Sequence, residues 1–507
     1  MKFGGSSVAD AARIRRVAEL VADAVGPSEP AAPIVVSSAM GGVTDSLFAI
    51  ARTALGGRAA QADALERVTA LQRQHEEALA QLEPAPGAFG ESTAGTAGTA
   101  GTAGTAGTAG TAGTAGTAGT ASAVRGRVER YFTELRDIVI GVSLLGELSP
   151  RSLDAITSYG EKLAVELVAS ALRAGGTPAE AISAEDIVVT DDVFGNAAPD
   201  MAATAARARR LSDLARAGTV PVVTGYIGAS PAGVTTTLGR NGSDYSAAIV
   251  GAAVGADEVW IWTDVDGVMS ADPRLVTGAR SLPALSYVEA SELAYFGSKV
   301  IHPRTIVPAV AAGVPIRIKN TFNPAHPGTL IGADASGSGA VKGVTVIRDL
   351  ALVTVEGLGM LGVPGIAART LGAVAMAGAN VLMISQSSSE SNIALVIARS
   401  EVAPALLALR EAFAPELRRH DVDAIGAQEG MAIITVVGSG MRGTPGMAGR
   451  FFSVLGRAGI NVSAIAQGSS EYSISCVIHD DGGAGTGETH TVHGALRAVH
   501  HEFIEMQ

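Results

Sequence analysis

Four apolar, strand-like runs with little polar alternation occur in the chain up to about residue 330. They lie at residues 34–38, 220–226, 259–264 and 314–320. Strands that are covered on both faces have this composition, whereas half-exposed strands alternate apolar and polar residues. Helical stretches such as 152–176 and 243–256 lie between these runs. The alternation predicts a largely parallel sheet in a layered α/β fold.

Length and charge narrow the class of protein. A chain of 507 residues predicts about two to four domains. The 37 basic and 49 acidic residues give a net charge of −12, which argues against a general nucleic-acid binder or a protein of anionic membranes. The single cysteine, Cys476, excludes an internal disulfide framework and is expected in the core of a strand. Without a signal peptide or an apolar run of membrane-spanning length, a cytoplasmic protein is predicted.

Two low-complexity segments mark boundaries along the chain. Residues 93–121 repeat TAG in tandem and offer no charge, no large apolar side chain and no helical or strand period. Such a segment cannot bury enough surface to offset the entropy of ordering it. It is therefore predicted to be a flexible surface insertion without chemistry. Residues 335–342, which begin ASGSGA, are interpreted as a linker.

Beyond this linker the chain repeats itself. The stretches that begin at Thr354 and Thr435 align without a gap, and Pro364, Gly365 and Asn380 match Pro445, Gly446 and Asn461. Each copy has the pattern strand, loop, helix, strand, turn, strand. The spacing exceeds the usual solenoid period, so two copies of a small α/β module are predicted, at 343–425 and 426–507.

Three glycine-rich stretches imitate nucleotide motifs but lack the residues that the chemistry needs. GLGMLG (357–362) and GSGMRG (438–443) have the G-x-G-x-x-G spacing, yet the strands that follow end without an acidic residue for a ribose. GGAGTGET (482–489) has Glu488 where a phosphate loop requires lysine. The nine histidines form no ligand pattern, so no protein metal site is predicted.

The first residues, MKFGGSSVAD, suit an anion. Gly4 and Gly5 allow the backbone to approach a ligand closely, Lys2 adds a positive charge, and a predicted helix follows. Judged alone, the stretch fits equally well an ordinary turn before a surface helix. Phosphate loops normally follow a strand, and only two residues precede Phe3. Either the chain begins a few residues upstream or the first strand is very short.

Other stretches add polar groups at strand ends and glycines. SSAMGGVTD (37–45) ends a strand in small and hydroxyl residues, and TTTLGRNGSDYSAA (235–248) places Arg240 before a helix. WTDVDGVMSADPR (262–274) carries an acidic loop, and AYFGSKVIHPRT (294–305) carries Lys299. A hairpin turn, a polar turn and a solvated lysine are the alternatives for the last three. Together with Lys2, these cations suit a nucleoside triphosphate and a small anionic acceptor, because ligands of open α/β sheets bind at carboxyl strand ends.

These stretches, with SYGEKL at 158–163, resemble the signature motifs of the aspartate kinases, which have the amino-acid-kinase fold. The paired C-terminal modules resemble ACT domains, which bind amino acids. IKNTFNPAHPGTLI, ISQSSSE and IAQGSSEYSIS are similar to the kinase half of bifunctional aspartokinase–homoserine dehydrogenases. The resemblance covers nearly the whole chain except the TAG insertion. It implies a three-layer α/β/α sandwich over 1–334, followed by the two ACT-like modules, and no dehydrogenase activity because the chain stops about where that enzyme would begin.

The resemblance also implies a reaction, the phosphorylation of the L-aspartate β-carboxylate by MgATP to 4-phospho-L-aspartate, the first step toward lysine, threonine, methionine and isoleucine. By this resemblance, Lys2 and Asp244 are the catalytic residues. Aspartate would be bound by Ser38, Thr44, Glu161 and Arg240. The nucleotide would be bound by Gly4, Gly5, Thr263, Asp264, Met269, Arg274 and Lys299. Mg²⁺ would be carried mainly by the ATP phosphates and water.

The family usually has tyrosine at the position of Met269, a departure that puts this residue in doubt as a nucleotide ligand and predicts weaker ATP binding. Gln386 and Gln467 match glutamines that bind effector threonine in the bifunctional relatives. The resemblance therefore implies feedback inhibition by L-threonine, with L-lysine second, in a homodimer or homotetramer assembled through the ACT-like modules. A polar turn at a dimer interface is the alternative for the two glutamines.

Two other functions stay open. A sister kinase of glutamate, acetylglutamate or a nucleotide would share the fold and the glycine-rich loop. A catalytically impaired amino-acid sensor would use only the paired modules. The presence of Lys2, Glu161, Arg240 and Asp264 argues against the sensor.

Overall fold

The computed structural model describes residues 1–26, 31–83, 112–297, 301–333, 339–387, 391–481 and 491–506, with side chains left out at 112–121. The chain forms two compact units. The first comprises Met1–Val265 and Arg304–Pro327, and the second comprises Asp266–Pro303 and Gly328–Gln507. No helix among the described residues is long and apolar enough to cross a membrane.

A parallel sheet forms the centre of the first unit, as its apolar runs predict. It belongs to an eight-stranded sheet of order β3-β4-β2-β1-β7-β9-β10-β8, and the neighbouring pairs from β3 to β9 are all parallel. Their bounds are β1 Lys2–Phe3, β2 Val35–Ser37, β3 Ala179–Ile182, β4 Val220–Thr224, β7 Val259–Thr263 and β9 Ile316–Asn320. The strand β1 contains two residues. It is nevertheless central, because it pairs with β2 on one side and β7 on the other.

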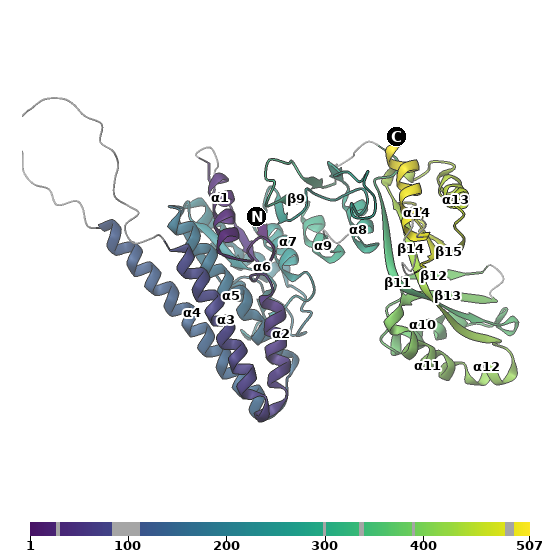
Figure 1. The fold of residues 1–507 in the computed structure, drawn as a ribbon, viewed down its shortest axis with the longest axis horizontal. Coiled ribbons are helices and arrows are strands. Elements are labelled where there is room, and N and C mark those ends of the chain that lie inside the picture. The colour runs from purple at the N-terminus through teal and green to yellow at the C-terminus, as the bar shows by residue number, and fades with distance from the viewer. Residues whose placement is uncertain are drawn as a thin grey trace, which may run out of the picture. The chain divides into compact units, whose positions relative to one another are not determined.

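Helices cover the sheet because its strands are apolar on both faces. Phe3 and Val35 pack in one cluster with Ile14 of α1 and Leu167 of α5. The helices α6 and α7 pack on each other, and α7 also contacts β1, β2 and β7. Figure 1 shows the long helices α3, α4 and α5 side by side. The bounds are α1 Ala11–Asp23, α2 Val43–Ala54, α3 Gln61–Leu82, α4 Ala112–Leu145, α5 Pro150–Ala174, α6 Met201–Arg216, α7 Gly242–Val254 and α9 Pro303–Ala312.

The TAG segment differs from its prediction at one end. Residues 112–121 form the first turns of α4, whereas most of the repeat lies outside the described residues. The packed part of α4 explains this, because Val128, Phe132 and Leu135 are buried against the other helices. Once a helix is held by packing, adding residues to its end avoids the cost of nucleation, and alanine extends it readily.

The second unit contains a six-stranded antiparallel sheet in the order β12-β13-β11-β14-β16-β15. Its strands are β11 Gly343–Glu356, β12 Met383–Gln386, β13 Asn392–Ala398, β14 Ala424–Val437, β15 Val462–Gln467 and β16 Ser473–His479. Its helices are α10 Ile366–Met376, α11 Val402–Ala412, α12 Ala414–Arg419, α13 Met447–Arg457 and α14 Thr491–His500, followed by the π-helix η6 His501–Glu505. The two copies thus have the predicted pattern of strand, helix, strand and strand.

The two modules interleave instead of following one another. The first half of β11, residues 343–347, pairs with the end of β14, while residues 350–356 pair with its beginning. Accordingly, Val344 packs in the core of the second module and Val353 in the core of the first. The boundary predicted between residues 425 and 426 therefore does not describe two separate bodies.

Two segments of the range predicted for the kinase-like domain pack with the second unit. They are residues 266–303 and 328–333. They supply the helix α8 Tyr287–Tyr295 and the parallel pair of β8 Ala284–Leu285 and β10 Thr329–Ile331. The expected linker ends early, because Val341 is buried in the core of the second module and the Lys342 N–H donates to the carbonyl of Val437. Cys476, as predicted, lies in a strand core, on β16, where burial raises its pKa to about 12.

One carboxylate ties α8 to the second module. Glu289 is almost fully buried and accepts hydrogen bonds from the backbone N–H and hydroxyl of Ser439, at 2.8 and 2.7 Å. It also accepts from the N–H and hydroxyl of Ser286, at 2.8 and 3.0 Å. Burial alone would raise the pKa of Glu289, but these four donors outweigh it and lower the pKa.

We therefore expect Glu289→Gln to destabilise the protein by about 1–3 kcal/mol at neutral pH, because an amide cannot accept from both serines. A lowered carboxyl pKa stabilises the fold above the unfolded value and is lost as the pH falls through the folded value. The difference between variant and wild type should therefore shrink on acidification. Urea unfolding at several pH values measures it, with Glu292→Gln on the same helix as control. A cost equal to the control would contradict this account.

Candidate functional site

The carboxyl ends of β1 and β2 bring the predicted site residues of the first unit together. Gly4 and Gly5 follow β1, and Ser38 follows β2, with its N–H bonded to the carbonyl of Phe3 at 3.1 Å. A Cβ on Gly5 would lie 3.4 Å from the Ala39 carbonyl oxygen, so the two loops are in contact. Thr44 lies in the first turn of α2, just beyond the left-handed Gly42. The parallel strands thus place small and hydroxyl residues at one edge of the sheet.

Lys2 forms a nearly buried ion pair with Asp244, which lies in the first turn of α7. The ammonium lies above the bare backbone of Gly4, because a Cβ there would be 3.2 Å from Lys2 Nζ. Any larger residue at position 4 would crowd the charge. The pair therefore connects the central strand to a helix N-terminus, where backbone N–H groups favour anions.

Glu161 is the most perturbed group of this cluster. It lies on α5 and is 3% exposed, and its Oε2 has no hydrogen-bond partner among the described residues. Gly160 lets α5 approach the loop closely, since a Cβ there would lie 2.9 Å from the Ala39 Cβ. Burial raises the pKa of Glu161 to about 8, against smaller lowering by the Ala39 N–H and the charge of Lys2. A buried carboxylate oxygen without a partner fits a cationic group of a ligand.

The remaining predicted residues are placed as follows. Arg240 is exposed on the turn before α7 and forms no ion pair with a described residue. At the end of β7, the Thr263 hydroxyl donates to Asp264 at 3.1 Å, and Asp264 is exposed. Met269 and Arg274 lie in the second unit, where Arg274 is paired with Asp272 at 2.6 Å. Lys299 lies outside the described residues.

The predicted effector glutamines occupy equivalent positions in the repeat. Gln386 ends β12 and Gln467 ends β15, which are the two outer strands of the six-stranded sheet. Both side chains are exposed. Each has the same relation to its own module, as the repeat in the sequence predicts.

Three residues that the sequence did not single out support the cluster. Asp154 on α5 accepts from the N–H and hydroxyl of Thr237, at 2.9 and 2.7 Å, and from the Gly195 N–H at 2.8 Å. Tyr226 has a positive φ of 66°, and burial, together with the nearby charge of Glu161, raises its pKa. Only the residues TGY at the end of β4 could have drawn attention to Tyr226, because Asp154 and Thr237 are brought together by the fold.

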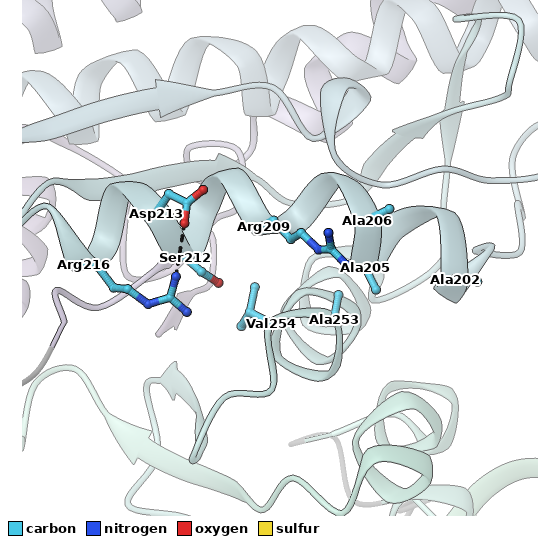
Figure 2. Close-up of a pocket in the computed structure, with 9 residues that line it drawn as sticks. All are labelled: Ala202, Ala205, Ala206, Arg209, Ser212, Asp213, Arg216, Ala253 and Val254. Carbon is cyan, nitrogen blue, oxygen red and sulfur yellow. Dashed lines mark hydrogen bonds and ion pairs between the residues drawn. The ribbon is translucent and has the colours of Figure 1, made fainter.

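Figure 2 shows a surface groove of about 570 Å³ between α6 and the end of α7. Its polar side chains are Arg209, Ser212, Asp213 and Arg216, and Arg216 is bonded to Asp213 at 3.1 Å. None of the predicted site residues lines this groove. The groove and the strand-end cluster therefore share no residue.

Comparison with known proteins agrees with this geometry. The amino acid kinase family model matches residues 1–320, and an ACT domain model matches 353–413 and 434–503. The chain belongs to the amino acid kinase family. The residues of the strand-end cluster all lie inside the range that this family matches.

Among its relatives is the bifunctional aspartokinase/homoserine dehydrogenase 2 of Arabidopsis thaliana, 34% identical over 99% of this chain and 50% of that protein. Aspartokinase 1 of the same plant is 30% identical over 100% of this chain and 80% of its own length. The crystal structure of Escherichia coli aspartokinase III with aspartate and ADP matches with a TM-score of 0.73 and 26% identity, over 99% and 98% of the two chains. The chain spans about half the length of the bifunctional relatives. The resemblance to aspartate kinases and the predicted α/β fold are confirmed.

The raised pKa of Glu161 predicts a pH dependence of stability. A carboxyl whose folded pKa lies above its unfolded value of 4.5 disfavours the folded state progressively as the pH rises from that value to about 8. Glu161→Gln removes this penalty, so the variant should gain stability relative to wild type across that range. The gain is roughly 1.4 kcal/mol for each unit of pKa shift. Denaturant unfolding from about pH 5 to about pH 9 measures it, with exposed Glu129→Gln as control. A pH-independent difference would refute the assignment.

Proposed function

We propose that this chain is an aspartate kinase, which transfers the γ-phosphoryl group of ATP to the β-carboxylate of L-aspartate. The observation that carries the proposal is the buried Glu161, with a partnerless oxygen, beside the Lys2–Asp244 pair at the strand ends. The aspartokinase relatives support it, since their names and the E. coli complex with aspartate and ADP state this chemistry for those proteins.

The acceptor needs no general base, because an aspartate side chain with a pKa of roughly 3.9 is already ionised at neutral pH. The difficulty is to hold two anions in line, so catalysis rests on positioning and on neutralising charge. Lys2 is suited to stabilise the transferring phosphoryl group, since Gly4 leaves its ammonium accessible from the backbone side. Asp244 orients Lys2 through their ion pair.

The other side chains position the substrates in this proposal. Glu161 receives the aspartate ammonium, and that cation lowers the pKa of the carboxyl back toward its ordinary range. The exposed guanidinium of Arg240 binds the α-carboxylate in bidentate fashion. Ser38 and Thr44 complete the pocket.

ATP and magnesium fit the residues present. Gly4 and Gly5 offer bare backbone, and Thr263 and Asp264 add polar groups at the end of β7. Met269, Arg274 and Lys299 complete the nucleotide set by resemblance. The described residues contain no group of three side chains that could hold a metal ion. A magnesium ion held mainly by the ATP phosphates suits this donor set and supplies charge neutralisation.

Regulation and assembly are assigned to the ACT-like region. The E. coli enzyme was also solved with lysine and aspartate, and Gln386 and Gln467 support threonine as the effector here. The first module exposes apolar side chains at positions where the second has polar residues, for example Leu358 against Ser439 and Met376 against Arg457. We assign this face to assembly into a dimer or tetramer. A cytoplasmic location, with roles in threonine, lysine and methionine biosynthesis, belongs to the same proposal.

The proposed kinase activity is tested by coupled ADP release with aspartate, with glutamate and without acceptor. Aspartate alone should be phosphorylated. Lys2→Met should lower kcat by about 100-fold or more, because it removes charge at the transferring group. Asp244→Asn should also lower kcat, and Asp45→Asn, exposed in the first turn of α2, is its control. Activity with glutamate alone would favour a sister kinase, and nucleotide turnover with neither acid would favour a sensor.

Feedback is tested by titrating the same assay with threonine and with lysine. Threonine should inhibit at lower concentration, because Gln386 and Gln467 match its ligands in the bifunctional relatives. Gln386→Ala and Gln467→Ala should each raise the half-inhibitory threonine concentration by about 5-fold or more, since each removes a hydrogen bond to the ligand. Exposed Gln428→Ala on β14 serves as control. Inhibition by lysine with indifference to threonine would overturn the effector assignment.

A further inference from the structure

The segment that follows β7 is packed against the C-terminal end of the chain, inside the second unit. Ala271 and Val276 are buried in the same core cluster as Val492 of α14 and Phe503 and Ile504 of the π-helix η6. Figure 1 shows α14 against the sheet of this unit, in yellow. An apolar core therefore joins residues 266–281 to the last two helices.

A row of side-chain hydrogen bonds, from Ser270 through His500 to Glu505, crosses this core. Ser270 and His500 are both fully buried, and Ser270 Oγ lies 2.9 Å from His500 Nε2. The Arg280 N–H already donates to Ser270 Oγ at 3.0 Å. The serine hydrogen can thus point at His500 Nε2, and His500 Nδ1–H can donate to Glu505 Oε1, 2.9 Å away. Burial lowers the pKa of His500, against a smaller rise from Glu505, in keeping with a neutral ring.

Further contacts fix the segment on either side of this row. The Arg280 guanidinium donates to the carbonyl of Ile504 at 3.0 Å, and Arg497 donates to that of Leu275 at 3.2 Å. Gly278 admits the Glu505 carboxylate, since a Cβ there would lie 2.2 Å from Glu505 Oε1. A larger residue at position 278 would displace this carboxylate.

The held segment is the one that carries Met269 and Arg274. Ser270 directly follows Met269, and its carbonyl accepts from the Val344 N–H of β11 at 2.8 Å. Among the described residues, the bond to His500 is the one side-chain hydrogen bond between Ser270 and the C-terminal helices. Losing it leaves a fully buried imidazole nitrogen without its donor and the Ser270 O–H without an acceptor, which loosens the segment at this point.

We propose that His500, acting through Ser270, is a positioning residue that presents the segment 266–281 for nucleotide binding. The inference rests on the proposed function, because Met269 and Arg274 are nucleotide ligands only within it. Binding to a segment held in its bound conformation avoids the entropy of ordering that segment. The last residues of the regulatory region thereby set the affinity for ATP without touching it.

The test compares His500→Leu, Ser270→Ala and the double variant with wild type. The control is His501→Leu, because His501 is exposed and bonds the other oxygen of Glu505 but not Ser270. Calorimetry gives the Kd of a non-hydrolysable ATP analogue, the coupled assay gives KM for ATP and for aspartate, and thermal melting reports folding. Each single variant should weaken nucleotide binding by about 5-fold, and the double variant by no more than either alone. KM for aspartate should stay within about 2-fold of wild type in these variants. All binding constants of the His501→Leu control should also stay within about 2-fold of wild type.

Two results would overturn the inference. One is nucleotide affinity in Ser270→Ala and His500→Leu equal to that of the control. The other is a parallel loss of nucleotide and aspartate affinity with lowered melting temperature, which a purely structural role produces. If His500→Leu does not fold, Ser270→Ala alone decides. A wild-type protein that binds the analogue but does not phosphorylate aspartate refutes the proposed function and leaves this test in force, whereas one that binds no nucleotide refutes both.

Discussion

A buried ammonium needs a counter-charge, and the pairing of Lys2 with Asp244 at the end of the central strand meets that need. Removing either partner would leave an uncompensated charge, which is far more costly than losing an exposed ion pair. The pair fixes the N-terminus of α7 over β1. Glu161, which feels the charge of Lys2, has one buried oxygen without a hydrogen-bond partner among the described residues. Charged side chains thus gather at one edge of the sheet. In the proposed function, a charged ligand supplies the partner that the Glu161 oxygen lacks.

The sequence allowed the strands of the first unit to be predicted well, since β4 and β7 are largely apolar on both faces and no local signal competes. Lys2, Gly4 and Gly5 could be identified as candidate anion-binding residues, because glycine lets the backbone approach a ligand and lysine supplies a positive charge. Asp154 and Tyr226 could not be identified as parts of the site, because their partners come from distant segments such as β6 Thr235–Thr237. The packing of residues 271–276 against α14 and η6 could not be predicted either, since the contacts join segments that are more than 200 residues apart.

The duplicated modules show how equal patterns acquire different surroundings. Ser439 donates to Glu289 of α8, while its counterpart Leu358 is exposed. The same strand, loop and helix therefore serve internal packing in one copy and leave an apolar face in the other. The interleaved β11 and β14 make each copy depend on a strand half that belongs to the other, because residues 343–347 complete the second core. A ligand that orders one module consequently acts on a sheet shared by both.

The effect of a ligand bound to the modules can reach the proposed nucleotide ligands through the continuous chain. Asp264 follows β7 in the first unit, and the chain enters the second unit at Asp266. The proposed nucleotide ligands before and after this point are therefore held by different cores. Any ligand that changes how α14 and η6 hold residues 266–281 changes the affinity for ATP, and ATP must change the affinity for that ligand by the same factor. Regulation of this kind needs no separate signalling element, because the proposed nucleotide-binding segment is packed in the core of the second module.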